Sequence, residues 1–155
     1  SYRYTKSLPH SPPARPDFIE VVETFYYRAQ WAAKKIARGE LWVGKRCCDS
    51  TMKELLLTMI EWNVRAREGA DYPIWHGGRF LERWAPKSVL EGLRGIFSRY
   101  DEEDVRRALF KTVDLFNSIA GETAERMNLP YPGDIHKEVR GLIEEIFSEE
   151  KKPVK

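Results

Sequence analysis

The sequence is poor in cysteine and in long apolar runs, and each shortage excludes a class of protein. Its only two cysteines are the neighbours Cys47 and Cys48, which could form a disulfide only with strain. Without a Cys-x-x-Cys spacing, a structural zinc site is not expected either. Reduced thiols are the rule in the cytosol, so we expect a cytoplasmic protein. No stretch approaches the roughly 18 consecutive apolar residues of a membrane-spanning helix, so we expect no membrane partner.

Net charge and histidine are also scarce. The formal net charge is +2, which gives no support to a nucleic-acid partner, because such proteins usually carry a clustered basic face. The densest basic positions fit a solvated helix end; they are Lys34, Lys35, Arg38, Lys45 and Arg46. His10, His76 and His136 are far apart in the sequence, so we expect no metal site. The Gly77-Gly78 pair alone is too short for a phosphate-binding loop.

The first helix that the sequence predicts runs from residue 17 to residue 38. Its apolar residues recur at three- and four-residue steps, Asp17 can cap its start and Gly39 can end it. Beside this apolar stripe lie an acid, an amide and aromatic rings: Glu23, Tyr26, Tyr27, Gln30 and Trp31. Two interpretations remain open, a helix buried on two sides and a helix that forms one wall of a ligand site.

The second predicted helical stretch covers residues 40–68, with a bend near Gly44 or near Asp49-Ser50. Its apolar stripe is wide and includes Trp62. A stripe of this width indicates a central helix that packs against several neighbours.

Three further helices are predicted in the second half of the chain. Pro86 can begin a short helix that runs to Tyr100. Asp101 can cap a long helix that ends near Asn128, and Glu122 is a carboxylate close to the apolar stripe of that helix. A Leu-Pro-Tyr-Pro-Gly break follows, after which Asp134 opens the last helix.

These patterns predict an all-α bundle of five to seven helices with short connections, because no stretch alternates with the period of two that strands show. We expect an extended proline-rich linker at residues 1–16, a helical domain at residues 17–148 and a charged tail at residues 149–155. The sequence starts without methionine, which fits a fragment as well as a natural terminus, and the sharp end of the linker suggests that a further segment preceded it.

The segment from Tyr72 to Trp84 connects the second and third predicted helices and holds two of the five tryptophans. Aromatic walls beside a glycine pair suit a polar ligand, because glycine permits close approach of the backbone. The alternative is a connector pinned by buried tryptophans. From the residue chemistry alone we favour the packed connector, and we assign Trp84 to the core.

Four blocks of the sequence follow one another in a recognisable order. They read FIEVVETFYYRAQWAAKKIARGELW, WHGGRFLERW, YDEEDVRRALFKTVDLF and AGETAERMNLPYP. Together they extend from about Phe18 to Pro132, and in this order they resemble the C-terminal half of the aminoglycoside 6-adenylyltransferase family, whose members are similar to streptomycin adenylyltransferase.

The resemblance implies both a fold and a function. Members of this family begin with a nucleotidyltransferase domain, whose Gly-Ser motif and paired Asp residues bind magnesium and ATP. This sequence lacks that motif pair, so the resemblance implies the helical, substrate-binding half, inactive alone and without a cofactor of its own. In the intact enzyme, AMP would move from ATP to a substrate hydroxyl, and two metal ions would stabilise the phosphoryl group. The helical half would hold a small, cationic sugar with carboxylates and aromatic rings.

From the resemblance and the residue types together, we expect the first helix, the second helix and the Tyr72–Trp84 segment to enclose one cleft. Its predicted substrate-binding residues are Glu23, Tyr26, Tyr27, Gln30, Trp62, Trp75, His76 and Arg79. In the family, an acidic residue directly precedes the aromatic cluster of the first helix. Here that position is Thr24, and Glu23, one residue earlier, is the one candidate for a catalytic residue.

Two other functions remain open. The chain would also fit a stand-alone helical interaction module that partners a separate nucleotidyltransferase. A helical ribonuclease-type toxin would need an arginine and a histidine in close spacing, whereas Arg67 and His76 are farther apart.

Overall fold

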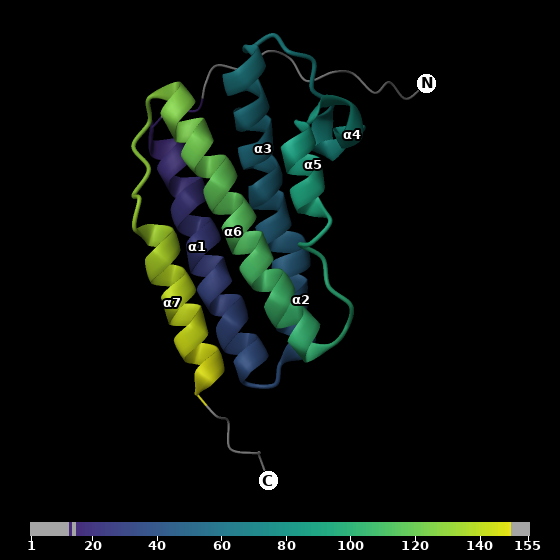
Figure 1. Ribbon diagram of the computed structural model, residues 1–155, viewed down its shortest axis with the longest axis vertical. Coiled ribbons are helices and arrows are strands. Elements are labelled where there is room, and N and C mark those ends of the chain that lie inside the picture. Colours follow the sequence, from purple (N-terminus) through teal and green to yellow (C-terminus); the bar gives the residue numbers. More distant parts are fainter. Residues whose placement is uncertain (1–12, 14, 150–155) are drawn as a thin grey trace.

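The computed structural model describes residues 13 and 15–149 as an all-α protein, which confirms the predicted fold class (Figure 1). These residues contain no β-strand. Within them, seven α-helices, one π-helical turn and one 3-10 turn follow in this order: α1 Arg15–Ala37, α2 Leu41–Arg46, η1 Cys47–Thr51, α3 Met52–Glu68, η2 His76–Gly78, α4 Leu81–Trp84, α5 Lys87–Leu93, α6 Glu102–Met127 and α7 Ile135–Ser148. None of these helices is long and apolar enough to cross a membrane.

The predicted linker and tail lie largely outside the described residues, which omit residues 1–12, 14 and 150–155. The last two residues of the predicted linker already belong to α1. The expectation that Asp17 caps this helix is therefore wrong, because Asp17 lies within its first turn, where a negative charge is favourable. The predicted end is confirmed: Gly39 has a φ of 88°, as in a glycine-terminated helix.

The second predicted stretch is irregular at one of the two expected positions. The π-helical turn Cys47–Thr51 joins α2 to α3, so the irregularity lies at Asp49-Ser50 and not at Gly44. Gly44 is instead a point of close packing. A Cβ atom there would lie 2.5 Å from Cγ1 of Ile36 and 3.1 Å from the carbonyl oxygen of Ala32. Glycine thus lets α2 lie this close to α1.

The helix that begins after Pro86 is shorter than predicted, since α5 ends at Leu93 and not at Tyr100. Three-residue turns follow α5, with backbone hydrogen bonds from Arg94, Gly95 and Ile96. Side chains of α2 and α6 donate hydrogen bonds to carbonyl oxygens of this segment. The donor and acceptor pairs are Lys45 to Ser98 at 3.0 Å and Arg107 to Gly95 at 2.7 Å.

The last two helices match their predicted bounds. Asp101 caps α6, because its Oδ2 accepts a hydrogen bond from the backbone N of Asp104 at 3.0 Å. Asn128 ends α6 in the left-handed conformation, with a φ of 54°, and α7 begins directly after Asp134.

α1 occupies the centre of the bundle and contacts α2, α3, α6 and α7. Figure 1 shows α1, α3, α6 and α7 side by side along the long axis. On the inner side of α1, the ring of Phe25 stacks on Phe116 with 3.7 Å between centroids, and the ring of Tyr26 meets both edge-on. Trp84 is 4% exposed, which confirms its assignment to the core. The inner side of α1 is thus committed to packing, and only its outer side is available to ligands.

Candidate functional site

Aromatic rings lie exposed on the outer side of α1 and α2. Tyr27 is 61% exposed, Trp42 is 68% exposed and Tyr100 is 60% exposed, while Trp31 is half-buried. Tyr27 and Trp31 are one helical turn apart on α1, and the rings of Trp42 and Tyr100 meet edge-on with 6.3 Å between centroids. We call these four residues the aromatic face. Extended apolar surfaces of this kind commonly mark binding sites.

Positive charges lie directly over these rings. The guanidinium carbon of Arg28 is 5.7 Å from the ring centroids of both Tyr27 and Trp31, and Nζ of Lys35 is 5.1 Å from that of Trp31. A cation over a ring face is attracted by the ring's quadrupole. Within the described residues, Arg28 forms no ion pair with a carboxylate, so its charge is balanced only by the rings and by solvent.

Two cavities flank the ring of Trp42. One has a volume of about 280 Å³ and is lined by Arg28, Trp31, Trp42, Val43, Arg46, Cys47 and Thr51. The other has a volume of about 390 Å³ and is lined by Trp42, Lys45, Arg46, Asp49, Ser50 and Tyr100. Trp42 and Arg46 belong to both. The two cavities together carry three cations and one carboxylate, and that carboxylate, Asp49, is already paired with Lys45.

Cys47, in the wall of the smaller cavity, is a structural thiol. Its Sγ lies 3.7 Å from the carbonyl oxygen of Arg28. Burial raises the pKa of Cys47 to about 11, so the thiol stays protonated near neutral pH and is a poor nucleophile. Cys47 and Cys48 are both free thiols, as predicted.

A second region of α1 has the opposite charge. A cavity of about 560 Å³ opens between the first turns of α1, the connection between α6 and α7, and the start of α7. Among the residues whose side chains the structure describes, its lining includes three carboxylates and no cationic side chain; the carboxylates are Glu23, Asp134 and Glu138. We call this cavity the acidic hollow.

Buried hydroxyl groups hold one wall of the acidic hollow in place. The Tyr131 hydroxyl donates to Oδ1 of Asn117 at 2.7 Å, and it lies 2.7 Å from the Tyr26 hydroxyl. Burial raises the pKa of both tyrosines, so both stay protonated and keep these hydrogen bonds. The connection between α6 and α7 is therefore fixed to α1 and α6 through side chains.

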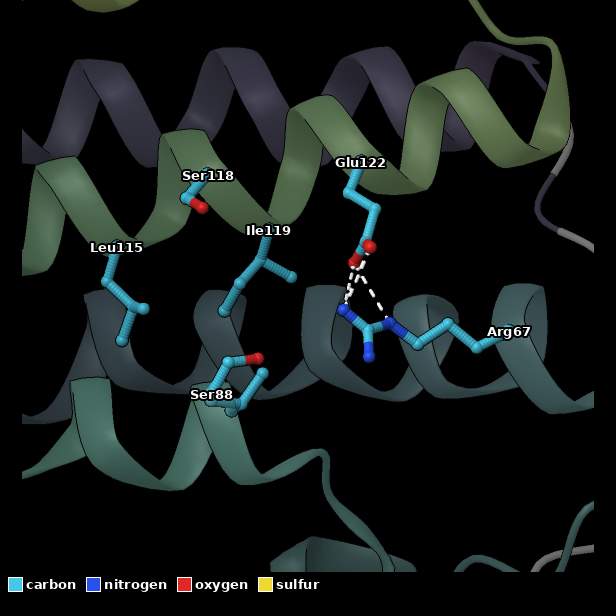
Figure 2. A pocket seen from close by; sticks show the side chains of 7 residues that line it. Arg67, Ser88, Leu115, Ser118, Ile119 and Glu122 are labelled. Atoms are coloured by element: carbon cyan, nitrogen blue, oxygen red, sulfur yellow. Dashed lines mark hydrogen bonds and ion pairs between the residues drawn. The ribbon is translucent and has the colours of Figure 1, made fainter.

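A fourth and smaller cavity, of about 180 Å³, lies between α3, α5 and α6, and Figure 2 shows the Arg67 and Glu122 side chains meeting beside it. Glu122 Oε1 accepts hydrogen bonds from Arg67 Nη2 and from Asn63 Nδ2, both at 2.8 Å. Burial alone would raise the pKa of Glu122, but the hydrogen bonds from Asn63 and Arg67 outweigh it and lower the pKa. The Arg67–Glu122 pair ties α3 to α6, and Glu122 is also paired with Arg126, whose Nε lies 3.5 Å away. The carboxylate of Glu122 is therefore already taken up by the protein's own cations.

A known protein family matches almost the whole chain. Residues 3–146 match the family model described as streptomycin adenylyltransferase. The chain belongs to the streptomycin adenylyltransferase family. The resemblance seen in the sequence is thereby confirmed.

Two relatives of this streptomycin adenylyltransferase family member are longer than the chain itself. The aminoglycoside 6-adenylyltransferase of Campylobacter jejuni is 18% identical over 120 residues, which cover 77% of this chain and 42% of the relative. The crystal structure of an aminoglycoside 6-adenyltransferase from Bacillus subtilis is similar with a TM-score of 0.80 and 20% identity, over 90% of this chain and 52% of that one. The chain therefore spans about half the length of these relatives.

In this family member, the predicted substrate-binding residues of α1 and α3 do not lie in one cleft. Glu23 lines the acidic hollow and Tyr27 belongs to the aromatic face. Tyr26 is 1% exposed and lies in the core. Gln30 is half-buried and donates weakly to the backbone carbonyl of Tyr26 at 3.4 Å, and Trp62 is half-buried against the core.

The residues predicted on the Tyr72–Trp84 segment lie around a different ring. Trp75 meets Phe80 edge-on with 5.2 Å between centroids, and the guanidinium carbon of Arg79 is 5.3 Å from the same centroid. His76 is exposed. Phe80 has a φ of 54°, a strained conformation for a bulky residue, so this segment is held in shape by its own contacts.

The structure adds residues that sequence reasoning did not select for the site, namely Trp42, Arg46 and Tyr100. Trp42 falls outside the apolar stripes of both predicted helices, and an aromatic residue outside a stripe is the one signal in the sequence that could have identified it.

Proposed function

We propose that this chain is the substrate-binding helical half of a cytoplasmic nucleotidyltransferase that moves AMP from ATP to a hydroxyl group of a small substrate. The observation that carries the proposal is the aromatic face, where rings on α1, on α2 and in the segment before α6 line two cavities of ligand size. Pockets of a few hundred Å³ lined by rings and a few polar groups are typical of small-molecule sites.

In this proposal the helical half positions the acceptor hydroxyl, whose oxygen forms a bond to the α-phosphorus of ATP while pyrophosphate leaves. Positioning of this kind supplies a large part of the catalysis of phosphoryl-type transfers. The described residues contain no group of three His, Cys, Asp or Glu side chains placed to hold a metal ion. We therefore assign magnesium and the ATP phosphates to a nucleotidyltransferase domain and derive no metal-dependent step from this chain.

The residues predicted from the sequence take different roles in this proposal. Tyr27 binds substrate together with Trp31, Trp42 and Tyr100 of the aromatic face. Glu23 lies in the acidic hollow, at the end of the bundle where α1 begins. The segment with Trp75, His76 and Arg79 is proposed to contact the nucleotidyltransferase domain.

Transfer of labelled AMP to acceptor alcohols, streptomycin among them, tests this proposal in the protein joined to its nucleotidyltransferase domain. Stacking on one ring contributes about 1–3 kcal/mol, so Trp42→Ala should raise KM for the accepted substrate about tenfold or more. Leu142→Ala, which removes an exposed apolar side chain of α7, should leave KM unchanged. An unaltered KM in folded Trp42→Ala protein would exclude the aromatic face as the substrate site.

The exposure of Trp42 also fits a second candidate function, a helical module that binds a separate nucleotidyltransferase chain. Exposed aromatic residues are enriched at the centres of protein interfaces. Analytical ultracentrifugation of the chain with that nucleotidyltransferase separates the two functions. A stable complex that Trp42→Ala dissociates would favour the interaction module.

A further inference from the structure

We infer that the ligand of the aromatic face is an anion with a planar ring, and not a polycationic sugar. The inference rests on the proposed function, in which this face binds the substrate, and it names the chemical class of that substrate.

Charge at the two cavities favours an anion. Their lining carries Arg28, Lys45 and Arg46 against the single carboxylate of Asp49. Since Asp49 is paired with Lys45, two guanidinium groups remain, and within the described residues neither forms an ion pair. A bare positive pair beside a cavity attracts anions and repels a polycation at close range.

The positions of the guanidinium groups match one ligand that carries both a ring and an anionic group. Arg46 lines the cavities on both sides of Trp42, so a ring packed on Trp42 from either side lies next to it. Arginine binds phosphate and carboxylate groups through two parallel hydrogen bonds. Cavities of about 280 and 390 Å³ suit a ligand of one or two rings.

The aromatic rings themselves argue against a cationic ligand. An aromatic cage binds an ammonium group through the faces of its rings. Here the chain's own cations already lie over those faces: Arg28 over Tyr27 and Trp31, and Lys35 over Trp31. A cationic ligand would have to displace these side chains, whereas an anion pairs with Arg28; Lys35 is already paired with Glu40 at 3.7 Å.

Three probes of one shape and different charge test the inference on the 155-residue chain: naphthyl phosphate, naphthalenemethanol and naphthylmethylammonium. Heteronuclear NMR can follow the indole N–H signals of Trp31 and Trp42 during each titration. The expected result is that naphthyl phosphate shifts both signals and binds at least about tenfold more tightly than the neutral probe, since hydrogen bonds to charged groups are strong. The ammonium probe should bind most weakly of the three.

Removal of one charge supplies the second test. Arg46→Gln should weaken the binding of naphthyl phosphate about tenfold and leave the binding of naphthalenemethanol unchanged. Lys137→Gln, which removes an equal charge from an exposed site on α7, should change neither. Higher salt should weaken the phosphate probe and not the neutral one.

The outcomes separate the two claims. If the neutral or ammonium probe, or streptomycin, shifts the same indole signals with equal or higher affinity, the anionic class is wrong while the face remains a ligand site. If no probe of any charge shifts them, the proposed substrate site itself fails, and the inference falls with it.

Discussion

The aromatic face and the acidic hollow both use α1, yet they differ in charge and in construction. The hollow presents three carboxylates against a wall fixed by buried tyrosine hydroxyls. The aromatic face presents cations over its rings. A polycation such as an aminoglycoside is therefore matched by the hollow, and an aromatic anion is matched by the face. One helix thus carries two surfaces that would select opposite ligands.

Helix electrostatics explains part of this contrast without any ligand. Acidic residues stabilise the first turn of a helix and basic residues the last turn, because of the helix dipole. Asp17 at the start of α1 and Lys34 and Lys35 at its end follow this rule. The effect fades within one turn, so it does not account for Glu23 or Arg28 in the interior of the helix. A role in ligand binding would explain the charges of Glu23 and Arg28, which the helix dipole does not.

The largest contrast is expected between two tryptophans that differ in burial. Trp84 is 4% exposed and its Nε1 donates to the carbonyl oxygen of Arg79 at 2.7 Å, so Trp84→Ala should cost about 3–5 kcal/mol of unfolding free energy. Trp42 is 68% exposed, so Trp42→Ala should change stability by less than about 0.5 kcal/mol. Urea unfolding measures both. A loss of several kcal/mol in Trp42→Ala would make the aromatic face a packing feature and not a binding surface.

The same two tryptophans show what could be predicted from the sequence. The core position of Trp84 followed from its place in a short connector between apolar helices. The bounds of α6 and α7 followed from local signals such as the Asp101 cap. Capping residues and helix breaks act on neighbouring residues, so helix bounds of this kind can be predicted from the sequence alone.

Contacts between distant residues account for what was missed. The segment after α5, which was predicted as helix, is held by a contact of this kind, since Lys45 donates to the carbonyl oxygen of Ser98, 53 positions away. The predicted cleft residues separate into the acidic hollow, the aromatic face, the core and the surroundings of Phe80. Tyr26, for example, faces inward to Tyr131, 105 positions away. Trp42 and Tyr100 meet only through the fold. Helical periodicity predicts which face of a helix is buried. It does not predict which faces of other helices pack against that face.

The packing of α2 on α1, which places Trp42, can be broken at Gly44. A Cβ atom there would lie 2.5 Å from Ile36 Cγ1, so Gly44→Ala should destabilise the protein by about 1–2 kcal/mol despite the helix propensity gained. Gly44→Ala should also lower the affinity of the aromatic face for its ligands and leave the affinity of the acidic hollow unchanged. Gly141→Ala is the control, because no atom lies within 4 Å of its added Cβ. It should stabilise α7 by about 0.5–1 kcal/mol. Equal responses of the two variants in urea unfolding would contradict the close packing at Gly44.

The rigid wall of the acidic hollow can be tested by removing single hydroxyl groups. Tyr131→Phe leaves Tyr26 and Asn117 without a buried partner and should cost about 1–2 kcal/mol. Tyr100→Phe in the aromatic face, where the ring is 60% exposed, should cost less than about 0.5 kcal/mol. Thermal unfolding compares them at equal side-chain volume. If both cost the same, the hydroxyl network does not fix the hollow, and the structural contrast between the regions is lost.

The smallest effect is expected for the charge of the hollow, and it bears most directly on the ligand of each region. Streptomycin, a polycation, should shift the backbone amide signals of Gly133 and Asp134 in NMR titrations and not the indole signal of Trp42. A solvent-exposed ion pair contributes about 0.2–1 kcal/mol, so Glu138→Gln should weaken this binding only about two- to fivefold. Glu145→Gln, an exposed position farther along α7, should not weaken it. Because both variants remove one carboxylate from the same helix, a difference between them measures the local field of the hollow and not the net charge of the protein. Streptomycin shifts at Trp42 in place of Gly133 would reverse the assignment of the two surfaces.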